Sequence, residues 1–132
     1  MKILLEFLSR YCLSLFEKHG FKFSDSGMGR NPAAGAWVLL DSKDMQIYIC
    51  NERDELTWEM RSLHDSNKKN WFSIDLISKL LGHSTDTGLM NTDNCDFLSE
   101  NMDEIMARFR EEEAQDTIVK LHKLEIERAK RM

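Results

Sequence analysis

Histidine and cysteine are the side chains of this chain that could ligate a metal or act in covalent catalysis. No histidine has a second metal-type ligand four residues away on its own expected element, and there is no Cys-x-x-Cys pair. A structural zinc site needs four such ligands, so we expect no metal and no cofactor. Cys95 stands where we expect a helix to begin, a position that can lower a thiol pKa, but no base is identifiable and we expect a structural role. The residues considered are His19, His64, His83, His122, Cys12, Cys50 and Cys95.

Two short motifs resemble catalytic signatures. Asp86-Thr87-Gly88 matches the triplet of dimeric aspartic proteases, but polar residues precede it, whereas the paired-carboxylate mechanism needs a rigid shared site. Gly27-Met28-Gly29-Arg30 has two glycines, yet neither the Gly-Lys-Ser/Thr ending of a phosphate loop nor a following helix. We interpret the first motif as part of a polar loop and the second as a flexible turn between strands.

Charge gives a stronger signal than these motifs. Residues 93–116 contain nine acidic and two basic side chains, a local net charge of −7, whereas residues 117–132 carry a net charge of +3. An ordinary solvated helix face, with its basic end matching the helix dipole, accounts for this pattern. The alternative is a surface that docks on a basic partner through opposite charge, with Asp103, Glu104 and Glu111 as candidate contacts.

A second acidic cluster surrounds an expected strand turn. Glu55, Thr57 and Glu59 alternate with apolar residues and share one face of their strand. Together with Trp37 or Tyr48 they would form an acidic–aromatic platform, and aromatic anchors ringed by charge are typical centres of interfaces. The alternative is that Trp37, Trp58 and Trp71 all belong to the core. The predicted partner-binding residues of this cluster are Glu52, Asp54, Glu55, Glu59, Trp37 and Tyr48.

The elements that must position these side chains follow from hydrophobic periodicity. Apolar residues recur every three or four positions over residues 2–19, which predicts an amphipathic helix ending before Gly20. Strands are expected over residues 21–26, with Phe21 and Phe23 on one face, and over 36–41, 45–50 and 55–61. Their connections are too short for crossover helices, so we predict an antiparallel meander of about four strands.

The second half of the chain is predicted to be helical. Ser73 should cap a helix of about nine residues that ends at Gly82, and residues 95–132 should form two helices or one long bent helix. The fold class is therefore α+β, with an N-terminal helix and two or three C-terminal helices packed on the sheet. The 132 residues have the length of one domain, 1–132, and we see no boundary within them.

Composition limits the function classes. The net charge of −5 argues against an open nucleic-acid-binding surface, and no apolar run is long enough to span a membrane. An odd number of cysteines does not form a disulfide framework, and Glu6, Arg10 and Glu17 interrupt the apolar N-terminus, which argues against a signal peptide. We therefore expect a cytoplasmic protein, as a monomer or a weak homodimer.

The layout of the whole chain resembles small bacterial immunity proteins of polymorphic toxin systems, including contact-dependent growth inhibition. The resemblance lies in a first helix ending in His-Gly-Phe (19–21), the strand meander, Trp-Phe-Ser-Ile-Asp-Leu-Ile (71–77), and Phe-Leu-Ser-Glu-Asn-Met-Asp-Glu-Ile (97–105). It implies a role and assigns no residues. The implied protein is cytoplasmic and binds and neutralises a cognate toxin domain, commonly a nuclease, by covering its basic active-site cleft.

Three functions compete. The first is this non-catalytic immunity protein, whose partner is the C-terminal domain of a cognate toxin. The second is an adaptor or regulatory subunit with an unknown partner, which could be a homodimer joined through the C-terminal helix. The third is a small hydrolase that uses a carboxylate and a histidine such as His64 or His83.

Overall fold

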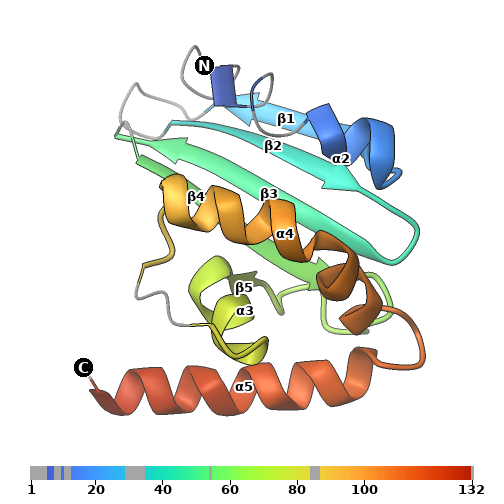
Figure 1. Cartoon of the computed structure of the whole chain (residues 1–132), viewed down its shortest axis with the longest axis vertical. Helices are drawn as coiled ribbons and strands as arrows, with labels where there is room; N and C mark the ends of the chain where they lie inside the picture. Colours follow the sequence, from blue (N-terminus) through green and yellow to red (C-terminus); the bar gives the residue numbers. More distant parts are fainter. Residues whose placement is uncertain are drawn as a thin grey trace.

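The structure is a computed structural model that describes residues 6–7, 10, 13–28, 35–53, 55–83 and 87–131. Five strands form one antiparallel sheet in the order β1-β2-β3-β4-β5 (Figure 1). The fold is α+β, as predicted, and the meander of the first four strands is confirmed. The strands are β1 (Lys22–Met28), β2 (Ala36–Asp41), β3 (Met45–Glu52), β4 (Glu55–Ser62) and β5 (Phe72–Ser73).

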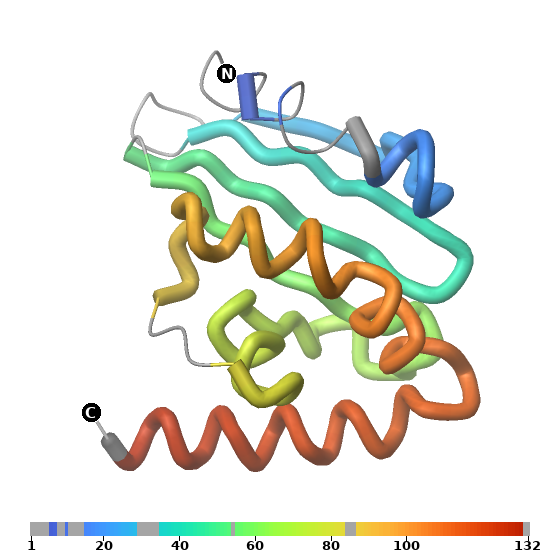
Figure 2. Tube along the Cα trace, in the orientation of Figure 1, coloured from blue at the N-terminus to red at the C-terminus, as the bar shows by residue number. Residues whose placement is uncertain are grey.

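The alternation of the three central strands separates a core face from an open face. In β2 the side chains of Ala36, Val38 and Leu40 are buried, while the residues between them are half-buried. β3 and β4 continue both sets, because Val38 pairs with Ile49 and Ile49 pairs with Trp58. α4 (Thr92–Arg108) lies over the core face and runs roughly along the direction of the central strands, as the tube in Figure 2 shows. The sheet thus has one face under helices and one face that no described helix covers.

α4 begins earlier than the sequence predicts. The side chain of Asn91 accepts a hydrogen bond from the backbone N–H of Asn94 at 2.8 Å, which is an N-cap and places Cys95 inside the first turn. The expected helix start at Cys95 is therefore wrong. Asn94, which is fully buried, also donates to the carbonyls of Thr87 and Leu89 and so holds the preceding loop against the helix.

The C-terminal region consists of two helices. α4 ends at Arg108, and α5 (Ala114–Arg131) begins after a turn that contains the three consecutive glutamates. Two hydroxyl groups fix this turn: Ser62 Oγ donates to the carbonyl of Phe109 at 2.9 Å, and Thr117 Oγ1 donates to the carbonyl of Arg108 at 2.6 Å. The turn is therefore held by β4 on one side and by α5 on the other.

The short elements between β4 and α4 anchor α5. α3 (Ile74–Leu80) follows β5 directly, and Ser73 occupies the predicted N-cap position. Its side chain caps no backbone N–H; it donates to the carboxylate of Asp75. Arg128 of α5 donates to that carboxylate at 2.9 Å and to Ser73 Oγ at 3.0 Å. Because Asp75 is buried, this charge-assisted contact ties α5 to α3.

The first part of the chain differs in detail from the prediction. α2 (Leu13–Lys18) and residues 6, 7 and 10 are helical, and the rest of the predicted helix over 2–19 lies outside the described residues. Phe21 is buried ahead of β1, whereas Phe23, which pairs with the buried Leu40, is 58% exposed, so of the two phenylalanines only Phe21 joins the core. Phe21 lies beside α2, because its backbone N–H donates to the carbonyl of Leu15, whereas Phe23 belongs to the edge strand β1.

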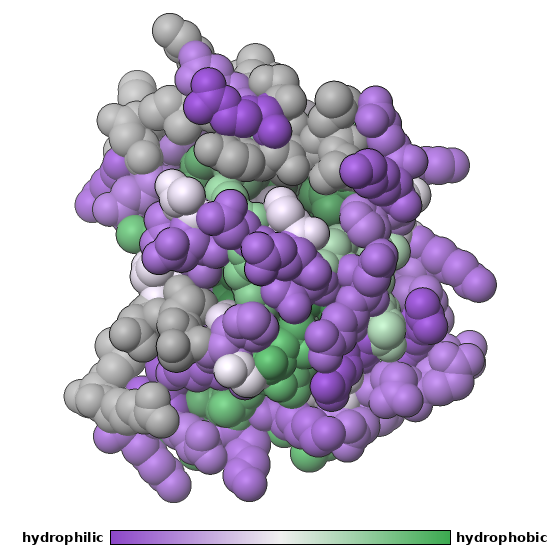
Figure 3. Space-filling view, in the orientation of Figure 1, coloured by the Kyte–Doolittle hydropathy of each residue, from purple (hydrophilic) through white to green (hydrophobic). Residues whose placement is uncertain are grey.

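The surface on the α4 side is mainly hydrophilic. Figure 3 shows hydrophobic side chains on this side in the space between α4 and α5. Among the described residues, no helix is apolar over the length that a bilayer requires.

Candidate interaction surface

An aromatic row occupies the open face of the sheet. Trp37 of β2 and Tyr48 of β3 have ring centroids 6.0 Å apart, and the Trp71 ring lies 5.9 Å beyond Tyr48. All three side chains are half-buried. Pairs at this spacing stabilise each other and stay rigid, since aromatic side chains have few rotatable bonds. The sequence predicted Trp37 and Tyr48 on one face, and the structure adds Trp71.

A glycine of the neighbouring strand makes room for the first ring of this row. Gly27 of β1 pairs with Trp37 of β2. A Cβ atom at Gly27 would lie 2.6 Å from two carbons of the indole, closer than any side chain can come. Trp37 thus lies over the backbone of β1. The interpretation of Gly27 as part of a flexible turn is wrong, because β1 extends through Met28.

Arg61 supports the other end of the row. Its guanidinium carbon lies 5.8 Å from the centre of the Trp71 ring, a cation–π distance. Arg61 donates to Gln46 Oε1 at 2.7 Å and to the carbonyl of Asp65 at 3.2 Å, while Gln46 donates to Asp41 at 2.9 Å. Only 6% of Arg61 is exposed. This network holds the Arg61 guanidinium against the Trp71 ring. Sequence reasoning did not assign Arg61 or Trp71 to the site, because the loop over residues 63–71 brings the two together.

Carboxylates border the row along β3 and β4. Glu52 and Glu55 face each other across the hairpin, and both are exposed. With Arg53 and Thr57 they line a shallow hollow of about 290 Å³. Arg53 has a φ of 53°, in the left-handed region that costs free energy for a residue with a Cβ. Asp54, the remaining predicted contact of this cluster, lies outside the described residues.

Glu59 joins the acidic border to the aromatic row. It lies directly opposite Tyr48 in the β3–β4 ladder. Partial burial raises the pKa of the Glu59 carboxyl above its usual value. The pKa of Tyr48 is raised to about 12, first by burial and then by Cys50, Glu59 and Glu52. A partly desolvated carboxylate against a rigid aromatic side chain is an arrangement that a cationic group would complement.

We name this surface the platform; it consists of Trp37, Tyr48, Trp71, Glu52, Glu55 and Glu59.

The second predicted acidic surface has a different character. Asp103 is 94% exposed and lies 3.2 Å from the His19 ring, and Glu104 lies 3.6 Å from Arg108. Glu111 lies in the turn between α4 and α5. Two of these carboxylates already have a basic side chain nearby, His19 for Asp103 and Arg108 for Glu104. This surface has the charge that we expected, whereas the row of Trp37, Tyr48 and Trp71 lies elsewhere, on the open face of the sheet.

The structure gives little support to the catalytic alternatives. His64 Nε2 lies 2.7 Å from Asp44, but Ser62 Oγ donates to the carbonyl of Phe109 and is buried, so it does not complete a triad. Burial and the neighbouring Asp96 raise the pKa of Cys95, which contradicts the lowering that a helix start would cause. Within the described ranges, no group of three or more histidine, cysteine or acidic residues could hold a metal ion.

Comparisons with known proteins identified no relative of this chain. No protein-family model, curated protein or solved structure matches the chain. The platform and the resemblance in layout described above are therefore the features that indicate a function.

Proposed function

We propose that this chain is a non-catalytic binding protein whose platform docks on a basic protein surface. The observation that supports this proposal best is the row of Trp37, Tyr48 and Trp71 on an open sheet face, bordered by carboxylates. Tryptophan, tyrosine and arginine dominate the residues that contribute most to binding at interfaces. The rigid row would supply such anchors, and the acidic border would select a cationic partner.

The partner that fits best is the cognate toxin domain implied by the resemblance to immunity proteins. A nuclease cleft is basic because it binds phosphates, so a rigid acidic surface could occupy it and exclude nucleic acid. In this proposal the chain acts in the bacterial cytoplasm and neutralises the toxin by covering its active site. An adaptor role would use the same surface and differ only in the identity of the partner.

The experiment is co-expression in bacteria with the toxin domain encoded immediately upstream of this chain, followed by co-purification. We expect growth rescue and a stable one-to-one complex. Trp37→Ala should weaken rescue, because loss of an anchor at the centre of an interface costs about 2 kcal/mol or more. Phe16→Ala is the matched control, since Phe16 is an exposed aromatic residue of α2, on the helix-covered side.

The outcomes separate the proposals. No rescue by the unaltered chain would contradict the immunity role. Rescue that survives Trp37→Ala but fails with Phe16→Ala would place the interface on the helices and contradict the platform.

A further inference from the structure

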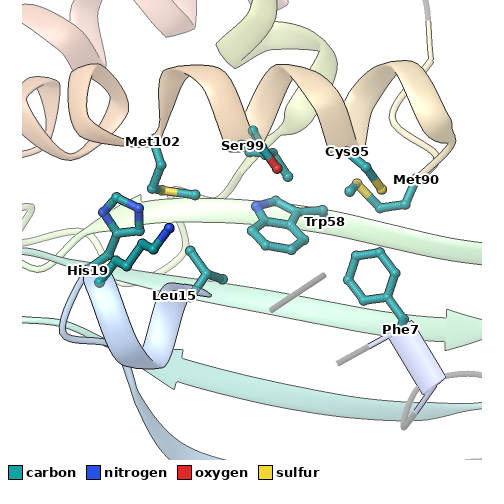
Figure 4. A pocket seen from close by; sticks show the side chains of 10 residues that line it. Phe7, Leu15, His19, Trp58, Met90, Cys95, Ser99 and Met102 are labelled. Carbon is teal, nitrogen blue, oxygen red and sulfur yellow. The ribbon is translucent and has the colours of Figure 1, made fainter. Parts of the chain in front are cut away.

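A cavity lies on the opposite side of the sheet from the platform, between α2, β4 and α4. Its volume is about 230 Å³ (Figure 4). Most of its wall is apolar, including Phe7, Leu98 and Met102. An apolar cavity of about 150 Å³ can hold benzene, so this one has room for a ligand of about ten non-hydrogen atoms.

Trp58 contributes an unused hydrogen-bond donor to this cavity. The residue is only 2% exposed, and its Nε1 has no hydrogen-bond partner among the described residues. Figure 4 shows the indole amid the lining side chains, with its nitrogen on the edge turned toward α4. A buried donor without an acceptor is costly, and buried polar groups are nearly always paired. The missing partner is an acceptor atom.

The polar part of the wall includes one cation, the Lys18 ammonium. Lys18 and His19 line the cavity, together with the hydroxyl of Ser99. His19 is engaged with Asp103 at 3.2 Å, whereas no ion pair of Lys18 is found in the described part of the chain. An anionic acceptor could therefore receive the Trp58 N–H and also lie near the Lys18 ammonium.

The remainder of the wall suits an apolar body. Phe7, Met90 and Cys95 line this cavity and also a neighbouring one of about 310 Å³, so apolar surface continues past the Trp58 ring. Methionine side chains adapt to irregular ligands because they are unbranched and polarizable. Polar groups placed on one part of an otherwise apolar wall fix the orientation of a ligand.

We propose that this cavity binds a small carboxylic acid with an apolar body, its carboxylate accepting from Trp58 Nε1 near Lys18. The proposal does not depend on the proposed function, because the platform and the cavity lie on opposite faces of the sheet.

The test is a titration of the full chain with octanoate, observed through the indole N–H resonances in ¹⁵N–¹H spectra. The chain has three tryptophans, and single Trp→Phe variants assign their signals. We expect the Trp58 signal to move downfield with a Kd near or below about 1 mM, as for efficient ligands of this size. The signals of Trp37 and Trp71 should stay in place.

Variants then separate the two polar contacts. Trp58→Phe keeps an aromatic six-membered ring and removes the pyrrole ring with its N–H donor, so it should weaken octanoate about tenfold, as followed by calorimetry. Lys18→Gln should weaken octanoate about threefold and leave octanol unchanged. Trp37→Phe and Lys69→Gln are the matched controls and should leave the affinity unaltered; both residues lie away from the cavity lining.

Three results would overturn the proposal. The first is an unmoved Trp58 signal at ~10 mM octanoate. The second is equal affinity of Trp58→Phe and the unaltered chain. The third is equal binding of octanol and octanoate with no effect of Lys18→Gln, which would show that the cavity does not recognise the carboxylate.

Discussion

Glu59 is the residue at which stability and binding are expected to conflict. Its carboxylate faces Tyr48 on the platform, and partial burial raises its pKa above the usual 4.5. A folded-state pKa above the unfolded one means that the folded protein binds this proton more tightly. The ionised form therefore costs stability. That cost is absent below the unfolded pKa, grows as pH rises, and is complete above the folded-state pKa.

Glu59→Gln should accordingly raise the melting temperature at pH 7 and raise it less at pH 4. The amide keeps the shape of the side chain and removes the partly buried charge. The same variant should weaken association with a basic partner, as expected when a functional residue is not optimal for stability. Thermal unfolding at the two pH values checks the first part. A lower melting temperature at pH 7 would show that the carboxylate stabilises the fold.

At the residue scale, strand alternation accounts for what could be predicted of the platform. It correctly placed Glu55, Glu59, Trp37 and Tyr48 on one face, because period-two patterns fix which way each side chain points. Trp71 and Gly27 escaped prediction for physical reasons. Trp71 joins the row because the loop that follows β4 brings it beside Tyr48. Gly27 lies opposite Trp37 only because the register of β1 against β2 shifts between Phe23 and Asp25, which the local sequence does not reveal.

At the scale of elements, the β3–β4 hairpin end combines two unfavourable features. Glu52 lies directly opposite Glu55, and Arg53 between them has a positive φ. Like charges placed opposite each other destabilise a strand pair. The hairpin end therefore presents two exposed carboxylates at some cost in stability, which fits a surface that binds a cation.

Glu52→Lys should raise the free energy of unfolding by about 0.2–1 kcal/mol, since it replaces a repulsive cross-strand pair with an attractive one. Denaturant unfolding at low salt is the measurement. Repeating it in 1 M salt is the control, because a gain between exposed charges should largely disappear when they are screened. A gain that persists at high salt, or no gain at all, would mean that the two carboxylates do not interact.

Prediction succeeded for elements with long periodic patterns and failed at their ends. The four main strands and the helical character of the C-terminal region follow from local alternation and helical periodicity, whereas the division of that region into α4 and α5 was left open. β5 has only two residues and exists because residues 72–73 pair with β4, which no local pattern reveals. The start of α4 depended on Asn91, whose capping role is hidden in a run of small polar residues.

At the scale of the whole molecule, the sheet divides two surfaces with different tasks. The core face holds α2, α4 and the Trp58 cavity, while the open face presents the platform. The chain carries a net charge of −5, and residues 93–116 carry −7. We expect this field to speed the approach of a basic partner at low salt, while the platform decides where the partner docks.

The most direct test is the affinity for the toxin domain of a double charge reversal, Glu52→Lys with Glu55→Lys. This variant keeps a like-charged pair across the hairpin, so its fold should be about as stable as before. Glu104→Lys with Glu111→Lys, on the other acidic surface, is the matched control. We predict at least a tenfold loss of affinity, about 1.4 kcal/mol, for the first variant and less than a twofold change for the control. Unchanged affinity of the platform variant, or a loss confined to the control, would contradict the account.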